Sequence, residues 1–231
     1  MATALKPGPS RWSESSSYAK SADTRQAILT AAIEAFGKSG FAAVSTRQIA
    51  AEAGVNQPAI AYYFKNKEGL YKACAEEIVD RYVARTAAPS LRAFEALDKG
   101  GVEPEAARAM LKEVMASLAD LTMASDDMAL SAKFVEREMR EPGTAYRYLY
   151  ENFWAPGVEV VALLIGAIKG ADRTDPSLRV EAIMLISGII AFTPGQSVAA
   201  QAMGWRALGA DQARLVLETV FRQIDLIPAA G

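Results

Sequence analysis

The chain has 231 residues, of which 51% are hydrophobic, and its 25 basic residues nearly balance its 27 acidic ones. This length fits one large domain or two modest domains with a sizeable core. Because the chain has no histidine and no glycine-rich phosphate-binding motif, we expect no enzyme activity, no metal site and no cofactor. The single cysteine, Cys74, excludes an internal disulfide and fits a reducing cytoplasm.

Residues 1–21 are rich in Ser, Ala and Pro and predict a flexible N-terminal arm. The arm carries Lys6, Arg11 and Lys20 against one acidic residue, so it is either a DNA-contacting arm or an idle tail. It lacks the apolar core of a signal peptide, and the longest apolar run, at 182–192, is too short to span a bilayer. We therefore expect a cytoplasmic protein with no membrane partner.

Residues 22–68 predict three helices. The first is expected at 23–39, and its apolar face consists of Ile28, Leu29, Ala32, Ile33, Ala35 and Phe36. Ser45 is placed to cap the second helix, and Gln48 would complete a capping box. Gly54 permits the positive φ that ends the second helix. Such a tight turn between two short helices is typical of a helix-turn-helix, whose second helix enters the major groove of DNA.

The third helix follows a cap at Asn56 and buries Ile60 and Phe64. Its outward residues are small or polar at the start and aromatic further along: Gln57, Pro58, Ala59, Tyr62 and Tyr63. An outward Gln can pair with adenine, and Pro or Ala can touch a thymine methyl group. Lys67 begins the next helix, where the helix dipole disfavours a cation. We expect a DNA phosphate there, with a solvated lysine as the alternative.

Residues 22–72 resemble the N-terminal domain of the TetR family of bacterial transcriptional regulators. The resemblance rests on Ala31-Ala32, Phe36, Gly40-Phe41, Thr46, Ile49-Ala50, Ala53-Gly54-Val55, Tyr63-Phe64, Lys67-Glu68 and Leu70. It implies that Thr46, Tyr62, Tyr63 and Lys67 contact phosphates and that Arg47 reaches a guanine. It also implies that Gln57, Pro58 and Ala59 read bases. Ala61 stands where the family usually has tyrosine, which shifts the aromatic pair to Tyr62-Tyr63.

Residues 69–231 also predict helices, without strand-like alternation, so the expected fold is all-α, with a helix-turn-helix domain joined to a helical ligand-binding and dimerisation domain. A fourth helix at 67–86 is the expected lever between the two domains. Further helices are expected at 91–99, 104–123, 126–140, 143–169, 176–192, 195–203 and 211–226. Pro156 is expected to kink or break the helix at 143–169.

An aromatic group before Pro156 predicts an apolar cavity for a small effector. With residues from neighbouring helices, its expected lining is Met110, Phe134, Tyr146, Tyr150, Phe153, Trp154 and Phe192. Plain core packing is the alternative for each of these aromatic residues. The segments 134–142, 153–156, 175–179 and 204–205 are similar to a CecR-like subgroup of the TetR family, which implies apolar or toxic small-molecule ligands.

The two C-terminal long helices carry more apolar residues than one buried stripe needs. The residues expected at a homodimer interface are Ile183, Ile186, Ile190, Leu217, Phe221 and Ile224. The alternative is that both helices are central to the monomer core. The family resemblance implies a four-helix contact between two copies.

Together these features predict a ligand-responsive transcriptional regulator. We expect a repressor that an apolar or aromatic effector releases from a palindromic double-stranded operator, with recognition helices about 34–36 Å apart. One alternative is a regulator without a small-molecule ligand, which a closed, fully packed body would favour. The other is a helical enzyme or binding protein with a DNA-inert head. Activation also stays open, because operator position decides it.

Overall fold

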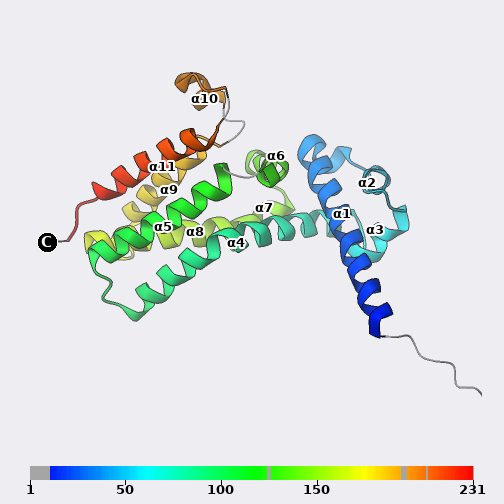
Figure 1. Ribbon diagram of the computed structural model, residues 1–231, viewed down its shortest axis with the longest axis horizontal. Coiled ribbons are helices and arrows are strands. Elements are labelled where there is room, and N and C mark those ends of the chain that lie inside the picture. The colour runs from blue at the N-terminus through cyan, green and yellow to red at the C-terminus, as the bar shows by residue number, and fades with distance from the viewer. Residues whose placement is uncertain (1–10, 124–125, 194–196, 207, 231) are drawn as a thin grey trace, which may run out of the picture.

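The computed structural model describes residues 11–123, 126–193, 197–206 and 208–230, with side chains described in 21–123, 131–193, 198–206 and 208–230. Every element within these ranges is helical, which confirms the predicted all-α fold. Figure 1 shows a head, formed by α1–α3, that the long helix α4 joins to a helical body. The elements are α1 (Arg11–Ala43), α2 (Thr46–Glu52), α3 (Gln57–Phe64), α4 (Lys67–Lys99), α5 (Pro104–Met123), α6 (Asp126–Arg140), α7 (Thr144–Leu149), the π-helix η1 (Tyr150–Trp154), α8 (Ala155–Lys169), α9 (Pro176–Ile190), α10 (Ser197–Met203) and α11 (Ala210–Asp225).

Helix α1 corrects the predicted arm, because residues 11–21 lie in the helix rather than in a flexible segment. No glycine or proline interrupts residues 11–36, so the helix continues toward the N-terminus from its packed part. The rest of the expected arm, residues 1–10, lies outside the described residues. Near its other end α1 is broken at Gly40, whose φ of +82° is in the left-handed region that glycine adopts without strain.

Helix α4 runs without a break through Pro89, although the sequence predicts separate helices on either side of it. A proline inside a helix removes one backbone hydrogen bond and costs about 3 kcal/mol. Burial on both sides of Pro89 offsets this cost, since Tyr82 precedes it and Ala93 and Leu97 follow it in the core. The head and the body therefore share one rigid helix, and the predicted boundary at 68/69 falls inside it.

Pro156 likewise does not break its helix. The preceding turn, η1, widens to a π-helix in which the Ala155 N–H bonds to the Tyr150 carbonyl, five residues back. Because Pro156 has no N–H to give, this wider turn lets the chain pass it without a break. The stretch Thr144–Lys169 is long and apolar enough to cross a membrane by length and composition alone. In the fold, however, α8 packs against α5 and α9 as the central helix of the body.

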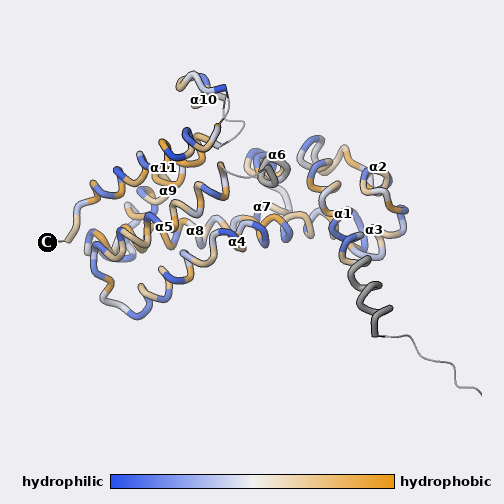
Figure 2. The backbone as a smooth tube through the Cα atoms, in the orientation of Figure 1, coloured by the Kyte–Doolittle hydropathy of each residue, from blue (hydrophilic) through white to orange (hydrophobic). Residues whose placement is uncertain are grey.

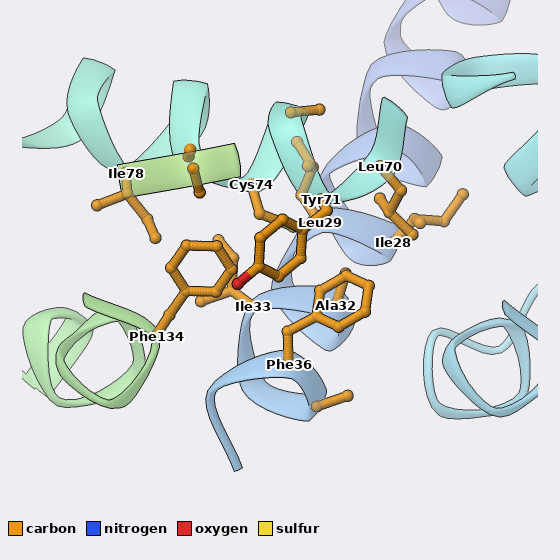
Figure 3. Packing of buried hydrophobic residues seen from close by; sticks show 14 of the residues in the cluster. Ile28, Leu29, Ala32, Ile33, Phe36, Leu70, Tyr71, Cys74, Ile78 and Phe134 are labelled. Carbon is orange, nitrogen blue, oxygen red and sulfur yellow. The ribbon is translucent and has the colours of Figure 1, made fainter. Parts of the chain in front are cut away.

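Two apolar cores organise the molecule. The head core joins α1, α2, α3 and the first half of α4 to Phe134 of α6 and Leu149 of α7. Figure 3 shows Phe134 pointing at Tyr71 of α4, close to Phe36 and Ile33 of α1. The body core lies between the second half of α4 and helices α5, α8, α9 and α11. Figure 2 shows hydrophobic positions recurring along each of these helices, as expected for helices that bury a stripe.

Helix α6 is the body element that docks on the head. Gly37 of α1 lies so close to α6 that an added Cβ would sit 2.9 Å from the Phe134 backbone nitrogen. The Arg137 guanidinium donates to the Gly37 and Lys38 carbonyls, which are near the C-terminal end of α1. A cation is favoured there by the helix dipole. The head is therefore attached to the body through both α4 and α6.

Candidate DNA interface and effector region

Side-chain caps fix the starts of both helices of the helix-turn-helix. Ser45 Oγ accepts a hydrogen bond from the Gln48 N–H, and Asn56 Oδ1 accepts one from the Ala59 N–H, each at 3.1 Å. The Gln48 side chain instead donates to Glu52 Oε1 at 3.0 Å, so α2 forms only the Ser45 half of the predicted capping box. Gly54 has the positive φ, +67°, that the sequence predicts for the turn.

The outer face of α3 carries most of the residues predicted to meet DNA. Gln57 and Pro58 are exposed at its start, and Tyr62 further along is 81% exposed. Arg47 is exposed on α2. Ala59 is different, because it is half-buried against the head core and offers less surface to a base.

An open groove of about 760 Å³ lies beside this face, lined by the segment before α2, the start of α3 and the junction between α3 and α4. Thr46, Gln57, Pro58 and Lys67 are among its lining residues. The Gln57 side-chain amide donates to Thr46 Oγ1 at 3.4 Å, across the two helices. This bond holds two of the lining residues of the groove together.

Tyr63 and Tyr62 have different surroundings. The Tyr63 hydroxyl is half-buried and lies 3.0 Å from Ser21 Oγ of α1, within hydrogen-bonding distance. Its ring makes an edge contact with the Tyr62 ring, with centroids 4.9 Å apart. Tyr63 therefore fastens α3 to α1, while the Tyr62 side chain is exposed to solvent.

Lys67 stacks on an aromatic ring, which the sequence does not indicate. Its ammonium lies 4.5 Å from the centroid of Phe41, a cation–π contact that helps to hold a lysine at the start of a helix. Just before it, Lys65 has φ +68° and ψ −56°, and the Asn66 N–H bonds to the Phe64 carbonyl at 2.8 Å. This three-residue γ-turn is strained for a residue other than glycine and sets the angle between α3 and α4.

The residues predicted to bind an effector make several different contacts. Tyr146, Tyr150 and Trp154 form a ladder along α7 and η1, with Tyr146 5.6 Å from Trp154 and 6.3 Å from Tyr150 between ring centroids. Tyr150 is 50% exposed. Phe153 points elsewhere and packs edge-on against Tyr82 of α4 at 5.0 Å.

Of the other three predicted effector residues, Phe134 belongs to the head core, against which Phe153 and Trp154 also pack, and two belong to the body. Phe134 is buried at 1% exposure and packs on Tyr71, so it belongs to the contact between α6 and the head. Met110 and Phe192 are half-buried against the body core. The predicted effector residues that pack on a core are thus divided between the head core and the body core, and the effector cavity stays a prediction. The two grooves described on the head include none of these residues.

Glu138 connects the ladder to the head, and sequence reasoning missed it. Its side chain is 3% exposed, and Oε1 accepts a 2.5 Å hydrogen bond from the Tyr71 hydroxyl of α4. Oε2 accepts from the backbone N–H groups of Gly143 and Tyr146, at 3.2 and 2.6 Å, and thereby caps α7. Burial and this hydrogen bond to Glu138 raise the pKa of Tyr71 well above its ordinary value. The sequence signal that could have identified Glu138 is its position four residues after Phe134, which places it on the apolar face of α6.

The residues predicted at a dimer interface divide by exposure. Ile183 and Ile190 of α9 are 51% and 40% exposed, whereas Ile186, Leu217 and Phe221 are partly buried against the body core. Ile224 is fully buried and belongs to the monomer core, which corrects that prediction. It points inward because α11 packs that face on α5. Three exposed apolar residues lie outside the six expected at the interface: Val180 (57% exposed), Met184 (69%) and Leu215 (45%).

The fold and the head together define a helix-turn-helix DNA-binding regulator of transcription. The family model of bacterial regulatory proteins of the tetR family matches residues 28–74, and that of the C-terminal domain of the HTH-type transcriptional dual regulator CecR matches residues 107–231. The chain belongs to the TetR family, with a C-terminal domain of the CecR type. It is a transcriptional regulator and not an enzyme.

Individual relatives agree with this assignment. The HTH-type transcriptional dual regulator CecR of Shigella flexneri is 33% identical over 211 residues, covering 90% of this chain and 92% of the relative. RutR of Escherichia coli (strain K12) is 42% identical over 60 residues, covering 26% of this chain and 28% of RutR. The crystal structure of AibR with isovaleryl coenzyme A and operator DNA superposes with a TM-score of 0.60 at 14% identity, covering 89% of this chain and 99% of AibR.

Proposed function

We propose that the protein is a cytoplasmic repressor that binds a palindromic operator as a homodimer and leaves it when an apolar or aromatic small molecule binds the body. The observation that carries the proposal is the exposed start of α3, where Gln57 and Pro58 border a groove that Lys67 also lines. A short polar helix start of this kind fits the major groove. The Shigella relative is named a dual regulator, so activation at differently placed operators is part of the same proposal.

Homodimer formation is supported by the outward face of α9. Val180, Ile183 and Met184 are each more than half exposed, and together they form an apolar patch on one helix. Patches of this kind mark protein–protein contacts. A twofold contact through α9 would carry two heads, and each recognition helix would then meet one half of a palindrome.

The effector is proposed to act on the ladder of Tyr146, Tyr150 and Trp154. Half-exposed aromatic rings on a π-helical segment offer apolar surface, and π-turns occur often at functional sites. A compound that inserts between these rings would displace the start of α7. Because Glu138 holds both that helix start and Tyr71, the displacement would reach α4 and the head. AibR has a similar fold, and its crystal structure contains both kinds of ligand, isovaleryl coenzyme A and operator DNA.

The test is a selection of DNA sequences from a random pool, followed by binding measurements on the winner. The expected outcome is a palindrome with half-sites about one helical turn apart. Apolar aromatic compounds are then screened for a change in tryptophan fluorescence and for a loss of DNA affinity. For each active compound, DNA should weaken its binding by the same factor by which the compound weakens DNA binding. A selected operator without any responding compound would favour the regulator without a small-molecule ligand. A head that shows no sequence preference would contradict the proposal itself.

A further inference from the structure

Helix α10 lies at the surface without an extensive packing partner among the described helices. None of its side chains described at 198–203 is buried, and Val198 is 81% exposed. Every other described helix packs extensively against at least one neighbour. Figure 1 shows α10 standing away from α9 and α11 at the top of the view. This helix therefore receives little stabilisation from its own chain.

A helix this short needs a surface to pack on. It has seven residues, whereas isolated helices shorter than about 12–15 residues are marginal in water. At helical spacing, Val198, Ala202, Ala199 and Met203 form a continuous apolar arc, and Gln201 lies on nearly the opposite side from Met203. The helix thus has an apolar face, and Val198 and Met203 on that face are 81% and 46% exposed.

The chain after α10 is anchored, so the helix is held in place rather than loosely attached. The Trp205 N–H bonds to the Ala200 carbonyl at 2.9 Å. The Trp205 ring contacts the Phe192 ring with centroids 5.8 Å apart, and both pack against the body core. This anchor presents the apolar face of α10 beyond the end of α9.

We propose that α10 packs against a second copy of this chain and extends the dimer contact of α9. The exposed apolar residues Val180, Ile183 and Met184 follow α9 toward its end, and Ile190 leads on to α10. Residues 182–205 contain no charged side chain. The centres of protein interfaces are depleted of charge in this way, whereas binding to DNA or to anionic lipid needs Lys and Arg.

The inference rests on the proposed homodimer and adds the part of the partner contact that α10 makes. Its test uses two cysteine variants of the full-length protein, Met203→Cys and Gln201→Cys, which are two positions apart and therefore on nearly opposite sides of one helix. The native Cys74 is fully buried and stays silent toward a water-soluble maleimide. In micromolar protein, we expect Cys at 203 to react at least tenfold more slowly than Cys at 201. In a Met184→Glu background, which breaks the α9 contact, the two rates should become equal.

A second pair of variants measures the energetic effect. Met203→Glu should raise the dimer dissociation constant at least tenfold in sedimentation experiments, while Gln201→Glu should leave it unchanged. Helical content measured by circular dichroism should be the same for both variants, because α10 packs little on its own chain. Equal reaction rates at 203 and 201 in a wild-type-like dimer would overturn the role of α10 and leave the dimer standing.

Two further outcomes have separate meanings. If the unmodified protein is a monomer at micromolar concentration, the proposed homodimer fails and this inference fails with it. If Cys at 203 becomes protected only when anionic phospholipid vesicles are added, a membrane surface rather than a second copy covers α10, which also overturns the proposal.

Discussion

The Tyr71 hydroxyl donates a 2.5 Å hydrogen bond to Glu138 Oε1, and this buried pair joins α4 to the end of α6. The same carboxylate holds the start of α7 through the Gly143 and Tyr146 N–H groups. One side chain therefore contacts the helix that enters the head and the segment that carries the aromatic ladder. A buried carboxylate that accepts from three donors can satisfy them only within a narrow range of positions. A displacement of α7 must therefore also displace the contact with α4.

We expect Glu138→Gln to destabilise the protein by about 1–3 kcal/mol, because its amide NH₂ would meet the backbone N–H donors or the tyrosine hydroxyl. Tyr71→Phe should cost about 1.5–3 kcal/mol, since it removes a donor to a buried charged group. Urea unfolding at a fixed protein concentration measures both. The double variant should cost less than the sum of the two single variants, and strictly additive losses would mean that the pair is not coupled.

The local features of the head could be read from the sequence because they depend on neighbouring residues. The caps at Ser45 and Asn56, the turn at Gly54 and the inward residues Ile60 and Phe64 all form as predicted. Such features need only the pattern of helix starts, turns and apolar spacing. The roles of the outward residues in DNA binding remain predictions.

The errors arose where distant packing overrides a local rule. Separate helices were expected on either side of Pro89, but burial on both sides of it keeps α4 continuous. At Pro156 a kink or a break was expected, and the chain stays helical there through an irregular π-turn. Phe134 was assigned to an effector cavity because the sequence does not show that α6 docks on α1. Ile224 was placed at the dimer interface because the spacing of apolar residues predicts which side of a helix is buried. It does not tell whether the same chain or a second copy covers that side.

Gln57→Ala should change the base preference at one position in each half-site. An amide at the start of a recognition helix reads one base edge, and a good pair contributes about 1–3 kcal/mol of discrimination. The hydrogen bond to Thr46 orients this amide, so Thr46→Val should show a smaller loss of the same kind. Binding to a panel of operator variants measures both effects. An unchanged preference profile for Gln57→Ala would remove its role in reading bases.

Lys67→Met should weaken binding to all sequences by a similar factor and make it less sensitive to salt. Each phosphate contact contributes about 0.9 to the slope of log affinity against log salt concentration on duplex DNA. Lys99→Met, at the far end of α4, is the matched control and should leave the slope unchanged. If the Lys67 variant keeps the wild-type slope, its ammonium serves the contact with Phe41 and not a phosphate.

Arg108→Met should destabilise the body by about 2–4 kcal/mol. The buried guanidinium donates to the Ile224 and Ile227 carbonyls at the end of α11, and these acceptors would lose a charged donor. Arg108 also pairs with Glu105, but that carboxylate is 82% exposed, so Glu105→Ala should cost at most about 0.5 kcal/mol. A comparison of the two by urea unfolding separates the carbonyl contacts from the ion pair. Equal losses would contradict this assignment.

Stability should fall in alkaline solution, beginning near pH 9. Burial raises the pKa of the Cys74 thiol above its ordinary 9.0, with Glu77 adding to the effect, and burial raises those of Tyr71 and Tyr82 above 10.0. Above those ordinary values the unfolded chain releases these protons while the folded protein keeps them. The unfolded state then binds fewer protons, so the free energy of unfolding decreases as pH rises, by about 1.4 kcal/mol per pH unit for each group.

Two variants identify the groups responsible for the alkaline loss. Cys74→Ala should move the onset from near pH 9 to near pH 10, because only the tyrosines remain. Tyr82→Phe should make the decline above pH 10 shallower, whereas Tyr62→Phe, at an exposed ring, serves as the control. The measurement is urea unfolding between pH 7 and about pH 11, a range chosen to bracket the ordinary thiol and phenol pKa values. A free energy of unfolding that stays level across this range would show that these groups titrate alike in the folded and unfolded states.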